Sequence, residues 1–496
     1  MPGFAVSSRG RYSFALDPNL VVFCVVGAQQ PSGNLDLLVA RLSNNLVRPR
    51  FKGGFQEKHM QKRVLSSAIA LALTALASGS ALAQSSVTIY GNVDVGFDHI
   101  NRKAGTRLLP ENTASAAINT ANNAVNNALS NKLSTNRVTP DLSSQSALGF
   151  KGTEDLGGGM KANFVLEGQM SVDAGNLARD GRLFGRQAFA GITTPYGEIR
   201  LGRQYAPIFF SSAVITTERF GGTDQFIEGG LSNSLNIRWD NALTYSAQVG
   251  DFRGQLGYSP NSGVPDRINF QRGGTASATA GSILGGNNSS AGGENKDGRG
   301  RSYGLFGAYV TNELTLSAGY GRTNFDNTPV YLLTDNTSAL FKIDDYSVWN
   351  LGAKYKLVDL GLTFSGAFGH ATYAINSTTA STNTYLGLTD GDLRVSSLVL
   401  GTRYDIGAVG LLAQWSETKF RNEGRGKNTG YTLGAEYSLS KRTTVYTRYE
   451  QLKDKGVGPA VVLTATGIRE TPTMVGANIT PEGKTTLLAV GVRHSF

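Results

Sequence analysis

The chain has little of what most soluble folds rely on. It contains one cysteine, 14 prolines among 496 residues, and only 17% charged residues. The cysteine is Cys24, so disulfide bonds and thiolate metal sites are excluded from the rest of the chain. No run of about 18 apolar residues occurs after Ala83, which excludes apolar helices that cross a bilayer from that region.

Glycine and aromatic residues are abundant instead, with 62 Gly, 19 Tyr and 23 Phe. Each glycine inside a helix costs about 1 kcal/mol relative to alanine, so this composition favours many strands joined by tight turns over a helical bundle. The formal charge of +10 is concentrated near the start, where residues 1–83 hold nine basic and three acidic residues. The remainder is nearly balanced, and nucleic-acid binding is therefore not supported.

Residues 60–83 have the three-part pattern of a secretory signal peptide. Lys62 and Arg63 precede an apolar run, and Ala81-Leu82-Ala83 supplies small residues for cleavage. A short buried helix is the alternative interpretation. Because residues 1–59 precede this segment, we interpret them as an extension upstream of a true start at Met60, with an extended signal as the alternative. The mature protein is expected to be 84–496.

Period-two alternation of apolar and polar residues recurs along the mature chain in about sixteen segments, including 87–97, 314–321, 431–439 and 485–496. A soluble sandwich also alternates. The number of strands and the aromatic residues near their tips favour a membrane barrel. The connections also alternate between short (154–159, 194–197, 249–251, 438–443) and long (101–142, 204–235, 260–300, 374–391).

A closed barrel follows from the physics of hydrocarbon, where each backbone N–H and C=O needs a partner inside the protein. With apolar helices excluded, only a closed sheet supplies these partners. The sequence therefore predicts an all-β transmembrane antiparallel β-barrel over 84–496, with short periplasmic turns and long extracellular loops. The last strand, 485–496, is expected to pair with 87–97 and to place Phe496 at a membrane interface.

Several stretches of the mature chain, in order, resemble one family. They are VTIYGNVDVGF (87–97), ALGFKGTEDLGGGMKANFVLEGQ (147–169), GRQAFAGITTPYGEIRLGRQYAP (185–207), RWDNALTY (238–245) and the terminal GVRHSF. These resemble the general porins of Gram-negative outer membranes, of the beta-proteobacterial trimeric type. The resemblance implies a sixteen-stranded trimer in the outer membrane, among lipids and lipopolysaccharide, that lets small hydrophilic solutes and ions diffuse passively.

The resemblance also implies that the third loop folds into the pore as a constriction, and that the terminal Phe496 is a signal for the outer-membrane assembly machinery. Alternation, with Phe150, Phe189, Ile199 and Trp239 facing lipid, then predicts a basic wall. Its members are Lys151, Arg186, Arg200 and Arg238. Loop 205–234 supplies acids to oppose them, namely Glu218, Asp224 and Glu228. The alternatives are solvated lumen residues and an ordinary surface loop.

One departure from the family concerns selectivity. An Arg commonly precedes the hydrophobic-Gly pair of the second strand, and here Ala147 stands before Leu148-Gly149. The expected anion preference is therefore weak. A substrate-selective channel and an adhesin acting through long loops are the alternative functions. The four histidines are isolated, with no HExxH or phosphate-binding loop, so we expect no enzyme activity, cofactor or metal.

The signal-peptide interpretation predicts the start of the mature protein. N-terminal sequencing of the protein from purified outer membranes should begin at Gln84, because Ala81 and Ala83 fit the cleavage site. Recovery of a chain that begins upstream of residue 84 would contradict the interpretation.

Overall fold

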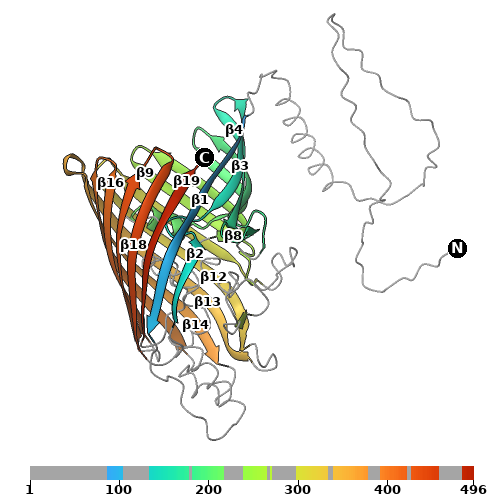
Figure 1. Ribbon diagram of the computed structural model, residues 1–496. Coiled ribbons are helices and arrows are strands. Elements are labelled where there is room, and N and C mark those ends of the chain that lie inside the picture. The colour runs from blue at the N-terminus through green and yellow to red at the C-terminus, as the bar shows by residue number, and fades with distance from the viewer. Residues whose placement is uncertain are drawn as a thin grey trace, which may run out of the picture. The chain divides into compact units, whose positions relative to one another are not determined.

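The computed structural model describes residues 86–103, 133–177, 181–216, 238–264, 268–270, 298–332, 339–377, 391–421, 426–456 and 483–496 (Figure 1). The predicted extension 1–59 and signal peptide 60–83 lie outside these residues. In the described part, no helix is long and apolar enough to cross a membrane.

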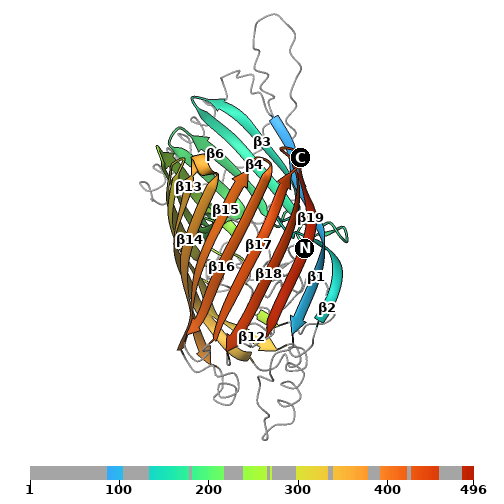
Figure 2. The ribbon, with the colours of Figure 1, turned by 60° about the vertical axis from the view of Figure 1, so that its left-hand side comes forward.

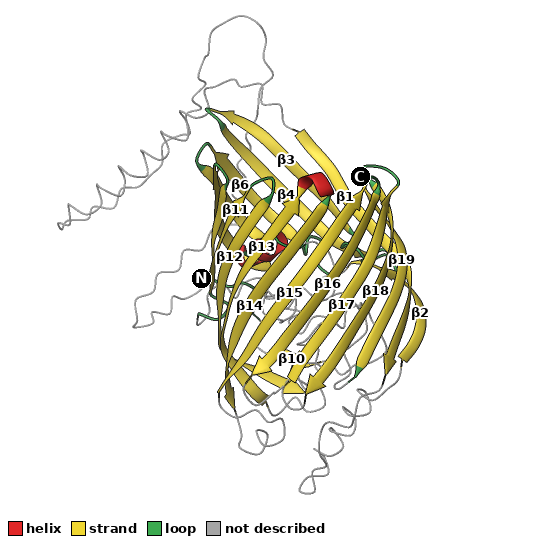
Figure 3. Ribbon diagram, turned by 90° about the vertical axis from the view of Figure 1, so that its left-hand side faces the viewer, coloured by secondary structure: helices red, strands yellow, loops and turns green. Residues whose placement is uncertain are grey.

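The described residues form one continuous antiparallel barrel wall of sixteen strands (Figure 3). The wall strands are β1 (Ser86–Lys103), β3 (Ala147–Gly157), β4 (Met160–Ser171), β6 (Gln187–Thr194), β7 (Gly197–Tyr205), β8 (Arg238–Val249), β9 (Phe252–Ser259), β11 (Ser302–Val310), β12 (Leu314–Leu332), β13 (Ala339–Leu357), β14 (Leu362–Ser377), β15 (Gly391–Ile406), β16 (Val409–Arg421), β17 (Gly426–Ser438), β18 (Thr443–Gly456) and β19 (Lys484–Ser495).

Five further elements accompany the wall. They are β2 (Leu133–Pro140), β5 (Asn176–Leu177), β10 (Ile268–Phe270), the helix α3 (Pro207–Ala213) and the 3₁₀ turn η3 (Val358–Leu360). Strand β2 pairs with the second half of β1, and β3 pairs with its first half. Strands β2 and β3 therefore act as one wall strand beside β1, and residues 141–146 interrupt it. This corrects the prediction of a loop over 101–142, because 133–140 is a strand.

The first and last strands close the barrel, as predicted (Figures 1 and 2). Residues Asn92 to Lys103 of β1 pair antiparallel with Ser495 to Lys484 of β19. Phe496 continues the ladder, because its N–H donates to the Gly91 carbonyl at 3.1 Å and its own carbonyl accepts from the Gly91 N–H at 3.2 Å. The wall therefore has no open edge at this seam, as hydrocarbon requires.

The two faces of the wall differ in chemistry, as the alternation predicted. Large apolar side chains such as Leu305, Leu351 and Leu433 are about half exposed on the outer face. Their neighbours in the strand, such as Ser302, Asn350 and Thr432, point inward. An apolar outside and a polar inside are the arrangement of a barrel that spans a membrane around a wet lumen.

Short turns gather at one end of the wall. The connections there are 158–159, 195–196, 250–251, 311–313, 358–361, 407–408 and 439–442. The opposite end carries the longer connections, including 104–132, 172–186, 206–237, 260–301, 378–390 and 457–483. The predicted alternation of turn and loop lengths is confirmed, and the two ends are called the short-turn end and the long-loop end below.

The start of the third long connection enters the barrel. Helix α3 packs against the inner faces of β11, β12 and β13 rather than beside its sequence neighbours. The Ser317 hydroxyl on β12 donates to the Ser211 carbonyl at 2.6 Å. Glycines make room for this segment, because a Cβ on Gly352 would lie 2.7 Å from Ile215. The predicted insertion of the third loop is confirmed for its described residues.

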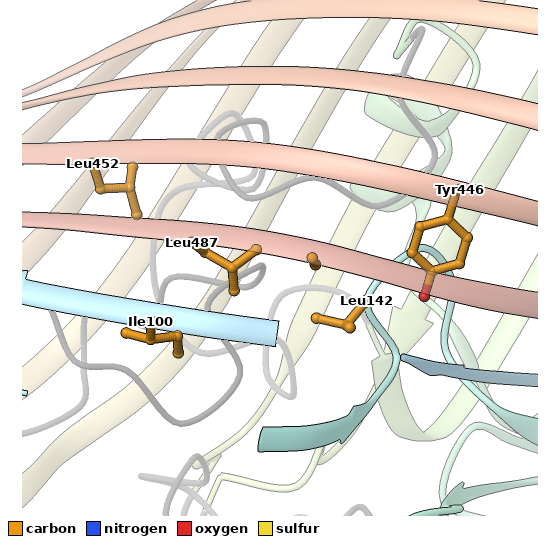
Figure 4. Packing of buried hydrophobic residues seen from close by; sticks show 6 residues of the cluster. Ile100, Leu142, Tyr446, Leu452 and Leu487 are labelled. Carbon is orange, nitrogen blue, oxygen red and sulfur yellow. The ribbon is translucent and has the colours of Figure 1, made fainter. Parts of the chain in front are cut away.

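A second segment also lies inside the barrel. Residues 141–146, between β2 and β3, turn inward, and we call them the inner turn. Leu142 of the inner turn packs in a buried apolar cluster with Ile100, Tyr446, Leu452 and Leu487 from the inner faces of β1, β18 and β19 (Figure 4). Two segments, α3 and the inner turn, therefore narrow the lumen from different parts of the wall.

Closure at the seam depends on Gly91. A Cβ at this position would lie 2.6 Å from the Ala147 carbonyl oxygen and would overlap the Phe496 ring. We expect Gly91→Val to lower the free energy of unfolding by about 1–3 kcal/mol, because a packed site must spread to admit the side chain. Urea denaturation followed by gel mobility of the folded barrel measures this.

Gly307→Val is the matched control for the seam. Gly307 lies in wall strand β11, and a Cβ there meets nothing within 4 Å. If Gly307→Val destabilises the barrel as much as Gly91→Val does, the effect belongs to strand glycines in general and not to the seam.

Candidate pore constriction

The inner turn is held by a buried carboxylate. Asp94 on β1 is fully buried, and its Oδ2 accepts backbone N–H bonds from Ser143 at 3.1 Å and Ser144 at 2.7 Å. Its Oδ1 accepts from the Tyr446 hydroxyl at 2.5 Å. Backbone groups that leave the sheet need new partners, and Asp94 supplies them for this turn.

Cationic side chains hold the turn from the opposite side of the seam. Arg448 donates to the Leu142 carbonyl at 2.8 Å, and Arg493 donates to the Ser143 hydroxyl at 2.7 Å. Both arginines lie on the inner faces of β18 and β19. Side chains from three wall strands, β1, β18 and β19, therefore hold the inner turn in place within the lumen.

An ion pair stands beside the inner turn. The Nε of Arg186 donates to Glu167 Oε1 at 2.5 Å, and the Tyr90 hydroxyl donates to Glu167 Oε2 at 2.8 Å. Both side chains of the ion pair are mostly buried. Arg186 also donates to the Gln145 amide oxygen of the inner turn. The ion pair thus joins the wall to the inner turn.

Tyr205, at the end of β7, links two arginines. Its hydroxyl accepts from Arg186 at 2.9 Å and from Arg238 at 2.7 Å. The Arg238 guanidinium also lies 4.3 Å from the centre of the Tyr205 ring and donates to Gln145 at 3.4 Å. The Tyr205 ring also stacks on Phe209 of α3, with ring centres 4.1 Å apart. Tyr205 and its two arginine partners therefore connect the inner turn with the inserted helix.

Three of the four predicted basic residues belong to this cluster. Arg186 and Arg238 share Tyr205 and Gln145. Lys151 lies over the Tyr90 ring, with its Nζ 5.1 Å from the ring centre. We call Lys151, Glu167, Arg186 and Arg238 the constriction cluster. With three cations and one carboxylate, it carries a net positive charge.

Arg200 lies apart from the constriction cluster. It pairs in register with Gly191, close to the 195–196 turn, and its guanidinium contacts Glu198 at 2.5 Å. It faces the lumen as predicted, but it lies near the short-turn end of the β6–β7 hairpin. Arg186 comes directly before β6, at the long-loop end of the same hairpin. Arg200 thus faces the lumen like the constriction cluster but differs from it in its level along the barrel axis.

Two of the lipid-facing assignments were wrong. Phe189 is 6% exposed and lies under the Arg200 guanidinium, 4.9 Å from the ring centre, on the inner face. Trp239 is 2% exposed, and its ring lies over the inner faces of Gly257 and Gly304, where an added Cβ would be 3.1 Å away. The outward residue of β6 is Ile192, which is 49% exposed.

The predicted acidic partners in the third loop, Glu218, Asp224 and Glu228, lie outside the described residues. Four members of the site were missed by sequence reasoning, namely Tyr90, Gln145, Glu167 and Tyr205. Alternation along 160–171 could have found Glu167, since it shares the inner face with Lys161 and Asn163. No periodicity marks Gln145, because it lies in the break between two strands.

Among the described residues, no three His, Cys, Asp or Glu side chains lie close enough to hold a metal ion. What the constriction cluster offers is a set of fixed positive charges inside the barrel, between α3 and the inner turn. A membrane-spanning barrel with a wet lumen, narrowed from inside and lined with charges, is a diffusion channel.

The chain belongs to the Gram-negative porin family, whose model matches residues 68–457. It is an outer-membrane channel for passive diffusion of small hydrophilic solutes and ions. It is 27% identical over 448 residues to an outer membrane porin protein of Bordetella pertussis, covering 86% of this chain and 99% of that protein. It is 28% identical over 439 residues to outer membrane porin protein 32 of Delftia acidovorans, covering 87% and 99%.

The fold is also that of solved porins. An anion-selective porin from Comamonas acidovorans matches with a TM-score of 0.56 and 23% identity, over 83% of this chain and all of that one. At this identity the likeness shows the shared barrel alone.

The carboxylate of the cluster should limit its positive field. We expect Glu167→Gln to raise the anion-to-cation permeability ratio, because removing one charge at about 4 Å changes the energy of a passing ion by about 1 kcal/mol, or about fivefold. The reversal potential of the purified channel in a salt gradient measures this. Glu154→Gln is the control, since Glu154 is exposed on the outer side of the same hairpin; equal shifts in both variants would contradict the prediction.

Proposed function

We propose that the constriction cluster gives this outer-membrane channel a weak preference for anions. The observation that carries the proposal is a chain of contacts between α3 and the inner turn: Arg186 pairs with Glu167, and Arg238 shares the Tyr205 hydroxyl with Arg186. Lys151 adds a third cation over the ring of Tyr90, whose hydroxyl donates to Glu167. A narrow passage with low-dielectric walls concentrates the field of such charges. The pairing of Arg186 with Glu167 keeps the preference weak.

The third loop supplies the remaining part of the proposal. Glu218, Asp224 and Glu228 would face the basic wall across the passage and set up a transverse field that orients dipolar solutes. The entry of α3 into the lumen supports this, since the loop continues from its end. The charges that would give the anion preference and those that would set up the transverse field both belong to the constriction. They would therefore act on the same passing solutes.

Assembly forms the second part of the proposal. We infer a homotrimer, because one solved relative of this fold, OmpT of Vibrio cholerae, is described in a trimer form, with a TM-score of 0.51 and 14% identity. Removal of residues 60–83 would release 84–496 for export. Phe496, exposed at the seam, would serve as the signal for the assembly machinery, and lipids and lipopolysaccharide would surround the wall.

A substrate-selective channel and an adhesin are the competing functions. An adhesin acts through its loops and needs no conducting lumen. The fixed charges inside the barrel favour a conducting channel. A purified protein that shows no ion conductance in a planar bilayer would contradict the channel and leave the adhesin. Saturation of the current by one solute would favour substrate selectivity.

Selectivity tests the constriction cluster directly. We expect the double variant Arg186→Gln/Arg238→Gln to shift the reversal potential toward cations, because two of three cations leave the cluster. Lys441→Gln/Arg442→Gln is the control with the same charge change in the exposed 439–442 turn, and it should leave the potential unchanged. Cation preference in the parent protein, or equal shifts in both variants, would contradict the assignment.

A further inference from the structure

Helix α3 presents aromatic side chains to the lumen. Its other face lies on the wall, because a Cβ added to Gly319 of β12 would be 3.0 Å from Ile208 and would overlap Ser211. Phe209 and Phe210 remain partly exposed. Since α3 lies inside the closed wall, the exposed part of both rings opens on the lumen. The interior of a membrane barrel with a wet lumen is ordinarily polar, so these two rings need a separate explanation.

The two rings belong to a connected group of four. Phe209 stacks on Tyr205, with ring centres 4.1 Å apart, and meets Phe210 edge-on at 5.5 Å. Phe210 also lies 6.0 Å from Phe306 on the inner face of β11. Aromatic pairs at these spacings attract one another. We call Tyr205, Phe209, Phe210 and Phe306 the aromatic cluster, and it extends from the wall across α3.

The aromatic cluster meets the constriction cluster at Tyr205. The Tyr205 hydroxyl accepts hydrogen bonds from Arg186 and Arg238, and the Arg238 guanidinium lies 4.3 Å from the ring centre. The same ring stacks on Phe209. One residue therefore joins two guanidinium groups to the rings of α3, and cationic and aromatic groups lie side by side in the passage.

Part of the positive charge is open to solutes. Lys151 is exposed on the inner face of β3. The side chain of Arg186, which pairs with Glu167, remains 14% exposed. Because both side chains lie inside the barrel, an anion in the lumen can contact them.

An aromatic carboxylate carries both groups that the passage can bind. Its carboxylate accepts charge-assisted hydrogen bonds from guanidinium and ammonium groups. Its ring can stack on, or meet edge-on, the exposed phenyl groups of α3, which adds an attraction beyond the burial of apolar area. An aliphatic carboxylate of similar size provides the charge and the apolar area without the aromatic face.

We propose that the constriction binds aromatic carboxylates weakly and passes them in preference to aliphatic ones. The carboxylate would lie on the side of Arg186 and Lys151, and the ring would lie on Phe209 and Phe210. Weak binding raises the concentration of a solute in the passage while still allowing it to leave. The proposal rests on the anion preference proposed above and names the class of anion.

Packing of α3 is the competing role for the rings. The contact of Phe210 with Phe306, which is 9% exposed, serves that packing. Packing needs apolar side chains of suitable size, whereas the exposed ring surface of Phe209 and Phe210 faces the lumen. Leucine at both positions keeps apolar side chains on α3 and removes the aromatic faces, so the double substitution separates the two roles.

The test compares two anions in the purified channel in planar bilayers. Sodium benzoate is placed on one side and sodium cyclohexanecarboxylate on the other, at equal concentration and neutral pH, and the reversal potential gives their permeability ratio. We expect the parent to favour benzoate, and Phe209→Leu/Phe210→Leu to lower the ratio about threefold, the share of the aromatic contact. Sieving by shape acts equally on both proteins, so the difference between them tests the rings.

Phe364→Leu/Phe368→Leu is the matched control. It makes the same two substitutions on the outer face of β14, where both rings are exposed, and it should keep the ratio of the parent. A ratio near one in the parent, an unchanged ratio in the α3 variant, or equal losses in the two variants would overturn the proposal.

Two further measurements keep the outcomes distinct. A reversal potential in a KCl gradient reports on the anion preference alone: anion preference without a benzoate preference refutes only the aromatic site, and cation preference refutes both proposals. If the α3 variant does not conduct, the parent provides the second test. Added benzoate should lower its single-channel KCl current more than cyclohexanecarboxylate does, and equal lowering would contradict the aromatic site.

Discussion

The need to pair every backbone polar group inside hydrocarbon governs this molecule. An antiparallel sheet meets it only if its edges meet, and β1 and β19 do so through paired residues from Asn92 to Lys103 and from Ser495 to Lys484. Phe496 extends that ladder to Gly91, so the chain ends inside the sheet rather than in a tail. Once the wall is closed, the alternation of side chains gives an apolar outer face and a polar lumen. The function of the channel then depends on the segments and charges that lie inside the lumen.

The lumen is shaped by segments that leave the wall, and each must replace the hydrogen bonds it gives up. The inner turn does this through Asp94, and α3 does it through its own turn and Ser317. The constriction cluster lies between them, with Tyr205 touching Phe209 on one side and arginines that reach Gln145 on the other. The side chains that hold the inserts in place are thus the same ones that carry the charge of the constriction cluster.

Sequence reasoning worked where the pattern has period two and failed where the wall departs from it. The wall strands, the short turns and the closing seam were predicted correctly, whereas strand 133–140 was expected to be part of a loop. Trp239 was expected to face lipid as the apolar neighbour of Arg238, but the pairing of β7 with β8 shifts register between Gly202 and Gln204. Positive φ angles at Gly202 and Asn241 mark this irregularity. Phe189 was placed outside because an aromatic ring was assumed to face lipid, whereas it supports Arg200.

The sequence by itself determined the class of fold, the direction of most side chains and the presence of basic residues in the lumen, because local alternation encodes all three. Only the tertiary structure decided which charges meet. Tyr90, Gln145, Glu167, Arg186 and Arg238 come from five segments of the chain, and they converge because the closed wall brings those segments together around the inner turn.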